Sequence, residues 1–284
     1  MTVISGNFVM YQDKFYSGNV YFDKNRMGEN IKFVEMFLNS DDNEDIEKGF
    51  IEDKPNKISK YWKKMTTLDI DNLFERETTA IYNGDRFDIS TIHDNQTTMC
   101  TDSGELYEEY NLEMYNRACF FQIKPLKEIP TFIQVWKPID LTKFNIPKVK
   151  KGSNVVKVQG KFAFMNDREY EVQVIEDDKL LLISSSRTDL DYGFTKVDEK
   201  RYEKIVSPKE VGYVFDRKTV VKYKYFNYIG TVIVGNQIKI TTNNVALAIT
   251  NFMKKDKDGG FYKFINLMDV QLLTQTWTRD DEHN

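Results

Sequence analysis

Short runs of alternating apolar and polar residues recur along the chain. Residues 170–174, Tyr-Glu-Val-Gln-Val, show the period of two that is typical of a strand with one buried face. The apolar run at 180–183 predicts a more buried strand. Asn83-Gly84, Asn166-Asp167 and Gly235-Asn236 stand between such patterns and predict tight hairpin turns, because Gly and Asn adopt positive φ at low cost. The pattern therefore predicts a mainly β protein.

These strands belong to a larger unit that begins in the same way four times. Each copy opens with a large residue that is followed five positions later by an aromatic one, in the pairs Tyr11 and Tyr16, Tyr82 and Phe87, Met165 and Tyr170, and Tyr223 and Tyr228. Gly-Phe follows at 49–50 and 193–194, and Phe252 is expected to be the counterpart of Phe194. A second block, which ends each copy and which we call the closing block, recurs at 61–70, 202–211 and 261–270, with a lysine at its third position. In copy two the block begins at Phe120 and matches the others only if its alignment is shifted by one residue.

We therefore predict four tandem SH3-like β-barrels, arranged as two pairs. Copies one to four span residues 1–76, 77–136, 156–218 and 219–277, with a connector at 137–155 and a tail at 278–284. Each copy is expected to hold a handful of short strands and one helical turn. Residues 207–210, Ser-Pro-Lys-Glu, predict such a turn with a Ser cap. Packing between copies is expected to add stability, because so small a unit buries a modest core.

Composition narrows the possible functions. The chain has 40 Lys and Arg against 44 Asp and Glu, a net charge of −4, which argues against a nucleic-acid partner. Two cysteines are too few for a disulfide framework and indicate a reducing compartment. There is neither a basic, apolar leader nor an apolar run of membrane-spanning length, so a cytoplasmic location is expected.

No residue is predicted to be catalytic, to bind a metal or to hold a cofactor. Cys100 is expected to be an inert strand residue, and His93 to lie exposed at a hairpin tip. The acidic cluster at 41–47 lacks the central Gly and closing Glu of a calcium loop, so it is predicted to be solvated. Its Asp45 has a counterpart in Asp189, which predicts a cap or turn role for both.

Positions shared by the copies must serve the fold, so function is expected where a copy departs from the others. Copy two departs most, in the acidic and Tyr-rich residues 102–115, a composition suited to a basic protein partner. The predicted partner-binding residues are Glu105, Tyr107, Glu108, Glu109, Tyr110 and Tyr115, with Asp41, Asp42 and Glu44 of copy one. The alternative is an amphipathic helix whose Leu106, Tyr110 and Met114 face the core.

The repeated Tyr…Gly-Phe…Tyr-x-Lys-x-Val…Glu-Val units resemble the small tandem β-domains of some Gram-positive immunity and interaction proteins. The resemblance spans nearly the whole chain and includes no catalytic motif. It implies a cytoplasmic, non-enzymatic protein that binds and neutralises a partner, with a toxin as the first candidate. Two alternatives stay open: an SH3-like adaptor or cell-wall or peptide-binding module, and an enzyme with a carboxylate site between the two halves.

Overall fold

The computed structural model describes residues 2–3, 5–11, 14–24, 31–40, 43–52, 61–65, 70, 72–116, 119–139, 155–175 and 179–283. Its strands form one large antiparallel sheet, which confirms the prediction of a mainly β protein. Within these ranges no copy closes into a barrel, because the strands of one copy continue the sheet of the next. Of the connector at 137–155, residues 140–154 lie outside the described residues.

The elements follow the predicted copies along the chain. Copy one and the start of copy two contain β1 (Thr2–Val3), β2 (Gly6–Tyr11), β3 (Lys14–Lys24), β4 (Ile31–Ser40), η1 (Asn43–Ile46), β5 (Ile51–Glu52), β6 (Tyr61–Met65) and β7 (Asn72–Tyr82). Copy two continues with β8 (Asp85–His93), β9 (Gln96–Thr101), α1 (Gly104–Tyr110), β10 (Glu113–Asn116), β11 (Cys119–Pro125), η3 (Leu126–Glu128) and β12 (Thr131–Pro138).

The second half repeats this order. Copy three contains β13 (Val155–Lys157), β14 (Gly160–Met165), β15 (Arg168–Val174), β16 (Leu180–Ser184), η5 (Arg187–Tyr192), β17 (Thr195–Asp198), β18 (Arg201–Val206) and η6 (Pro208–Glu210). The end of copy three and copy four contain β19 (Tyr213–Tyr223), β20 (Phe226–Val234), β21 (Gln237–Thr242), α2 (Val245–Thr250), β22 (Lys254–Lys255), β23 (Phe261–Asn266), η7 (Leu267–Asp269) and β24 (Leu272–Arg279).

The opening hairpin has the same register in every copy. The large residue of each copy is paired with the residue three positions later, in the pairs Tyr11 and Lys14, Tyr82 and Asp85, Met165 and Arg168, and Tyr223 and Phe226. Asn83, Gly84, Asn166 and Asp167 have positive φ between these strands, as predicted for tight turns. The turn at 207–210 is also confirmed, since the Ser207 amide donates to the Glu210 carboxylate in a capping box.

The helical turn of each copy ends in the same hydrogen bond. An amide donates to the carbonyl five residues earlier, in the pairs Phe50 and Asp45, Leu112 and Tyr107, Phe194 and Asp189, and Met253 and Ala248. The residue before each donor has positive φ, which is the left-handed end of a Schellman motif. These residues are Gly49, Asn111, Gly193 and Phe252.

This register corrects one predicted equivalence. Phe252 does not correspond to Phe194; it stands where copy three has Gly193, and Met253 takes the place of Phe194. Phe194 is buried, Met253 packs against the core, and Phe252 is 87% exposed. Counting positions from the opening aromatic misses this shift, because copy four has one additional residue, Asn251, between its helix and the left-handed position.

The closing-block lysine has the same contact in three copies. Lys63 donates to the carbonyl of Lys48, Lys204 to that of Tyr192 at 2.9 Å, and Lys263 to that of Asn251 at 2.9 Å. Each carbonyl belongs to the residue before the left-handed position. The lysine therefore satisfies a carbonyl that a helix end leaves without an intrahelical donor.

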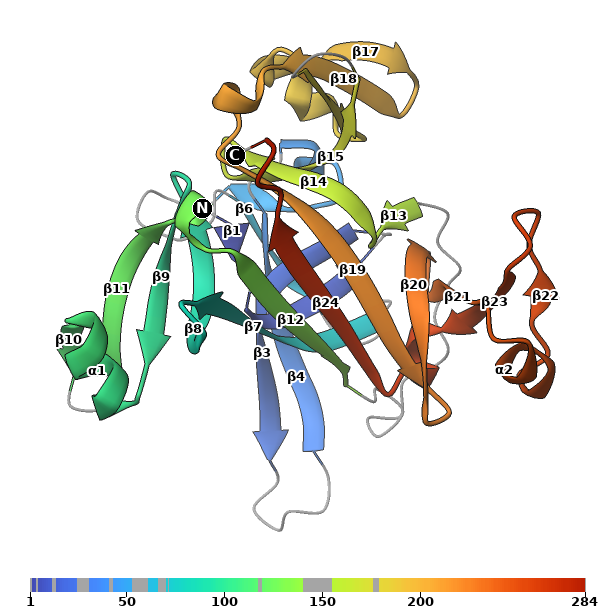
Figure 1. Cartoon of the computed structure of the whole chain (residues 1–284), viewed down its shortest axis with the longest axis horizontal. Helices are drawn as coiled ribbons and strands as arrows, with labels where there is room; N and C mark the ends of the chain where they lie inside the picture. Colours follow the sequence, from blue (N-terminus) through green and yellow to red (C-terminus); the bar gives the residue numbers. More distant parts are fainter. Residues whose placement is uncertain are drawn as a thin grey trace.

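Six neighbouring strands, in the order β2, β7, β12, β24, β19 and β14, join the two halves. Thr78, Gln134, Gln275 and Thr219 form one row across the four middle strands. The residue types in this row are Thr, Gln, Gln and Thr, so their order is the same from either end. The two halves are therefore related by an approximate twofold axis between β12 and β24. In Figure 1 copy two lies at the left, copy three above and copy four at the right of these strands.

The apolar cores also cross between the halves. The core of copy two includes Phe162, Phe164, Phe215 and Trp277 from the second half. The core of copy four includes Phe8, Met10, Phe74 and Trp136 from the first half. Copies one and three have smaller clusters of their own, around Tyr16 and Tyr170. Packing between halves is therefore part of the fold.

Candidate binding surfaces

Residues 102–115, singled out by the sequence, form α1 and the start of β10. Ser103 caps α1, its hydroxyl accepting from the Leu106 amide. Tyr107 stacks on Phe120 with ring centroids 4.4 Å apart. Tyr110 packs edge-on against Phe87, and its hydroxyl donates to Asp85 at 2.7 Å. The two tyrosines therefore hold the helix to the core of copy two.

The acidic residues of α1 point the other way. Glu105, Glu108 and Glu109 are exposed, and Tyr115 on β10 is 76% exposed. Met114 is also largely exposed, so the expectation that it faces the core is wrong; its strand lies beyond the helix, where helical spacing no longer applies. The predicted binding residues thus divide into exposed carboxylates with Tyr115 and inward-facing Tyr107 and Tyr110.

The predicted acidic residues of copy one have different surroundings. Asp41 and Asp42 lie outside the described residues. The Glu44 carboxylate accepts from the Arg187 amide at 2.6 Å, so it joins the helical turns of copies one and three.

Asp45 is fully buried, which contradicts the prediction of a solvated acidic loop. Its carboxylate accepts hydrogen bonds from Tyr16 at 2.7 Å, Lys14 at 2.8 Å, Lys48 at 2.9 Å and Ser40. Burial alone would raise the pKa of Asp45, but the charge of Lys14 and these hydrogen bonds lower it below its ordinary value of 3.8. Asp45 is therefore an ionised centre of the core of copy one.

Copy three repeats this arrangement. The Asp189 carboxylate accepts from Arg168 at 2.9 Å, from Tyr170 at 3.0 Å and from Ser184. Burial, followed by the charge and hydrogen bond of Asp189, raises the pKa of the Tyr170 hydroxyl. The shared Asp is a turn residue, as predicted, but its side chain serves the core and caps no helix end.

The two helices α1 and α2 occupy equivalent places and differ in what they expose. By the shared helix-end register, Gly104, Glu108 and Asn111 of copy two correspond to Val245, Ile249 and Phe252 of copy four. The copy-four residues are 57%, 71% and 87% exposed. Val245 and Ile249, four residues apart, share one face of α2, and Phe252 follows at the left-handed position just after the helix. Copy four therefore presents three apolar side chains where copy two presents Glu108, Asn111 and a glycine.

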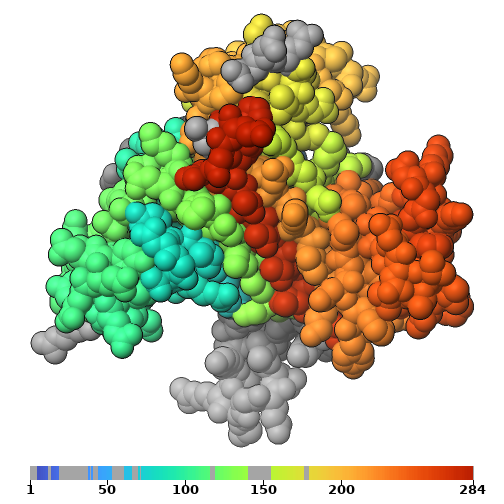
Figure 2. Space-filling model, in the orientation of Figure 1, coloured from blue at the N-terminus to red at the C-terminus, as the bar shows by residue number. Residues whose placement is uncertain are grey.

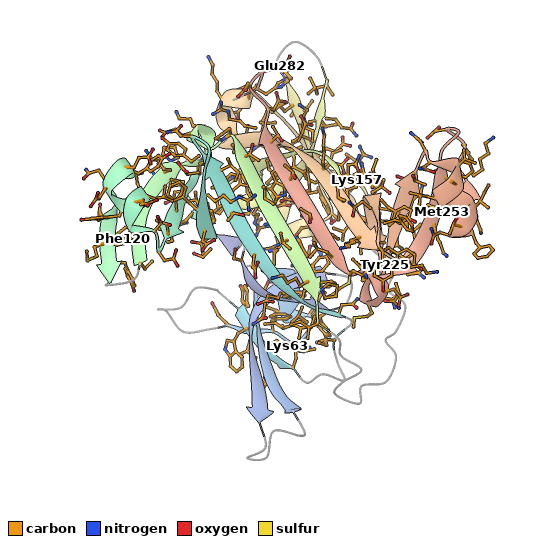
Figure 3. The ribbon with its side chains drawn as sticks, turned by 60° about the horizontal axis from the view of Figure 1, so that its bottom comes forward. Lys63, Phe120, Lys157, Tyr225, Met253 and Glu282 are labelled. Atoms are coloured by element: carbon orange, nitrogen blue, oxygen red, sulfur yellow. The ribbon has the colours of Figure 1, made fainter. Side chains whose placement is uncertain are left out.

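Two further aromatic residues of copy four are exposed at its opening turn. Tyr225 follows Lys224 in the opening turn of copy four, where both residues have positive φ, and it is 84% exposed. Phe226, 44% exposed, takes the position of Lys14, Asp85 and Arg168, which each contact the helical segment of their own copy. Figure 3 shows Tyr225 at the edge of copy four near the central strands, and Met253, the residue after Phe252, further out in the same copy.

We call Tyr225, Phe226, Val245, Ile249 and Phe252 the copy-four apolar surface. Exposed lysines lie beside it in the chain, at Lys224, Lys254, Lys255 and Lys257. Copy four forms the right-hand lobe in Figure 2. Sequence reasoning missed this surface, although the apolar residues at 245, 249 and 252 were a usable signal, because Phe252 was expected to be the counterpart of Phe194 and so to serve the fold.

Cys100 and His93 are two described side chains outside these surfaces that could carry chemistry. Burial and the neighbouring Cys119 thiol raise the pKa of Cys100 to about 11, so its thiol is protonated at neutral pH. His93 precedes the turn at Asp94-Asn95, exposed as predicted, and its Nδ1 lies 2.7 Å from an Asp167 carboxylate oxygen. Neither helix in the described parts of the chain is long and apolar enough to span a membrane.

Comparison with known proteins identifies a family but no named relative. The chain matches the model of the family described as "Uncharacterised conserved protein UCP033725" over residues 3–139 and 158–279. No curated protein matches the chain. The two matched segments correspond to the two halves that the central strands join. Since they cover most of its length, the chain belongs to this family of conserved proteins.

Proposed function

We propose that this is a non-enzymatic protein-binding protein, an inhibitor or immunity protein that neutralises a cognate partner through the copy-four apolar surface. The observation that carries the proposal is Phe252. Copies one, two and three have Gly or Asn at this position, as its left-handed backbone favours, whereas copy four has Phe at φ 52° with 87% of its surface exposed. A Phe at a left-handed position costs backbone free energy, and its ring buries little surface within the chain. Contact of the ring with a partner therefore explains this Phe better than the fold does.

The chemistry of the surface indicates what it contacts. Aromatic residues are enriched at the centres of protein interfaces, where they bury a large area. Lysines beside such a centre favour acidic residues on the partner, because complementary charges speed association and fix orientation. We therefore infer a protein partner with an apolar contact surface and an acidic rim.

A second candidate rests on α1. Its exposed Glu105, Glu108 and Glu109 form an acidic surface with Tyr115 close by in the chain, which supports a basic partner such as a toxin. Because α1 and α2 are equivalent helices, the same experiment tests both candidates at matched positions.

A photoreactive phenylalanine analogue placed at Phe252, and in a second protein at Asn111, tests the proposal in cells of the native source. Cross-linked proteins are identified by mass spectrometry and purified, and their affinity for the unlabelled chain is measured by calorimetry. We expect one protein to cross-link from position 252, and Ile249→Glu with Phe252→Asn to weaken its binding at least tenfold.

Each alternative outcome has a defined meaning. These substitutions introduce residues that copy two carries at the same positions, so the fold tolerates them there. Cross-linking and binding that depend on Asn111 and Glu108 would replace the first candidate with the second. Binding of the chain to lipid vesicles through Phe252, without any protein partner, would refute both.

A further inference from the structure

A cavity of about 850 Å³ lies between copies one and three, over the inner face of the central strands. Its floor contains Arg76, Gln134, Trp136, Arg217, Gln275 and Trp277, three residues from each half. The halves are related by the approximate twofold axis, so each guanidinium, amide and indole is present twice. The volume falls within the range of small-molecule sites, about 300–1,000 Å³.

The two arginines are held against aromatic rings in the same way. The Arg76 guanidinium carbon lies 3.3 Å from the ring centre of Phe8 and 4.8 Å from that of Trp136. The Arg217 guanidinium carbon lies 4.2 Å from the ring centre of Phe162 and 4.7 Å from that of Trp277. Stacking fixes the guanidinium planes, which favours binding of a planar or tetrahedral oxyanion.

The cavity is basic in a chain that is acidic as a whole. Seven basic and four acidic side chains line it, whereas the chain carries a net charge of −4. Three of the acidic residues, Glu169, Glu171 and Asp189, are paired with Arg217, Lys157 and Arg168. The lining holds three more basic than acidic side chains, and Asp45 and Glu203, just outside it, offset two of these charges at Lys14 and Arg201.

The arginines are also poorly solvated. Burial lowers the pKa of Arg76 well below its ordinary value of 12.5; Glu169 opposes this effect, and the like charge of Arg217 adds to it. Part of the Arg76 surface is nevertheless accessible, and Arg76 lines the cavity. Charges in so poorly solvated a place interact more strongly than charges in water, so an oxyanion beside them gains correspondingly more.

Neighbouring groups add hydrogen-bond donors. Trp136 Nε1, Trp277 Nε1 and Arg217 Nε are buried N–H groups that have no acceptor among the described residues. A buried donor without an acceptor is costly, and an oxygen-rich ligand on the floor supplies acceptors. The apolar rings of Phe8, Phe162 and the two tryptophans leave room for an apolar or aromatic body beside the charged group.

We propose that this cavity binds a small organic oxyanion, with a carboxylate or phosphate group at the arginines and an aromatic or apolar body against the tryptophans. The proposal is independent of the copy-four apolar surface. It differs from the carboxylate enzyme site between the halves, which the sequence left open as an alternative. Burial would raise the pKa of Asp167, but hydrogen bonding with His93 helps to lower it below 3.8, so this carboxylate stays ionised at neutral pH.

Phenyl phosphate and benzoate are suitable probes, with benzyl alcohol as their neutral counterpart. Two of the three tryptophans line the cavity, so intrinsic fluorescence reports occupancy, and calorimetry gives the affinity. We expect at least one oxyanion to bind at least tenfold more tightly than the alcohol and to weaken as salt is raised. Equal binding of all three probes, or no binding of either oxyanion, would overturn the proposal.

Two variants and a matched control locate the site. Arg76→Met should weaken oxyanion binding at least tenfold, and Glu169→Gln, which removes a negative charge from the lining, should strengthen it several-fold. Lys218→Gln changes a cation beside Arg217 on the exposed face of β19 and should alter affinity less than twofold. If Arg76→Met fails to fold, Glu169→Gln decides the matter: unchanged or weaker binding in that variant refutes the site.

Discussion

Single residues in this protein take on different roles through their neighbours. Asp45 belongs to an acidic run that suggests solvation, yet its carboxylate is buried among Tyr16, Lys14, Lys48 and Ser40. The partners come from three separate segments of copy one, so local composition could not indicate them. Only the repetition of the Asp in copy three suggested a structural role.

This network predicts a stability that depends on pH. The pKa of Asp45 is lower in the folded than in the unfolded state, so its contribution is present above about pH 4 and is lost as pH falls through the folded pKa. Asp45→Asn should cost about 1–3 kcal/mol at pH 7 and progressively less below pH 4. Urea denaturation from pH 7 to pH 3 measures this, with the exposed Glu47→Gln as control; a pH-independent difference would contradict it.

A substitution at Phe252 is predicted to stabilise the protein, in contrast to the substitution at Asp45. Its left-handed backbone costs a Phe roughly 1–2 kcal/mol, and the exposed ring gains little from the fold. Phe252→Gly should therefore raise the free energy of unfolding by up to about 1 kcal/mol, less than the full strain because Gly gains entropy when unfolded. Thermal unfolding checks this. A destabilised variant would mean that the ring packs in solution and is no free binding group.

At the scale of elements, the strands, turns and the Ser207 cap were predictable because short-range patterns specify them. The role of α1 was not. In the sequence, its tyrosines are equally compatible with a binding surface and with a face that packs on the core. Only the contacts with Phe120 and Phe87 distinguish the two. The apolar face of α2 was missed for a related reason, since the helix end sits one residue from where even spacing puts it.

The two sides of α1 should therefore respond differently to substitution. Tyr107→Ala with Tyr110→Ala removes two rings packed on the core of copy two and should cost roughly 2–4 kcal/mol, somewhat less than fully buried aromatics would. Changing Glu105, Glu108 and Glu109 to Gln should alter stability by less than about 0.5 kcal/mol. Chemical denaturation of both variants tests this; equal losses would contradict the assigned orientation of the helix.

At the scale of the molecule, the repeat predicted the parts of the structure but could not predict how they are joined. Each copy was expected to close on itself, whereas β12 pairs with β24 and the cores of copies two and four take aromatic residues from the opposite half. The pairing of β12 with β24 joins residues more than a hundred positions apart, and no periodic pattern indicates these contacts. The cavity between copies one and three arises from the same arrangement and was hidden for the same reason.

The joined sheet predicts that neither half folds alone. Residues 1–145 as a separate chain would expose one edge of β12, and the core of copy four in residues 146–284 would lose Phe8, Phe74 and Trp136. An uncovered apolar core and an unpaired strand edge favour aggregation over folding. We expect each half alone to lack a cooperative thermal transition and the two expressed together to regain it, as measured by circular dichroism and gel filtration. A half that unfolds cooperatively as a monomer would show that the central pairing is a contact between finished domains, and the cavity above it would then be free to open and close.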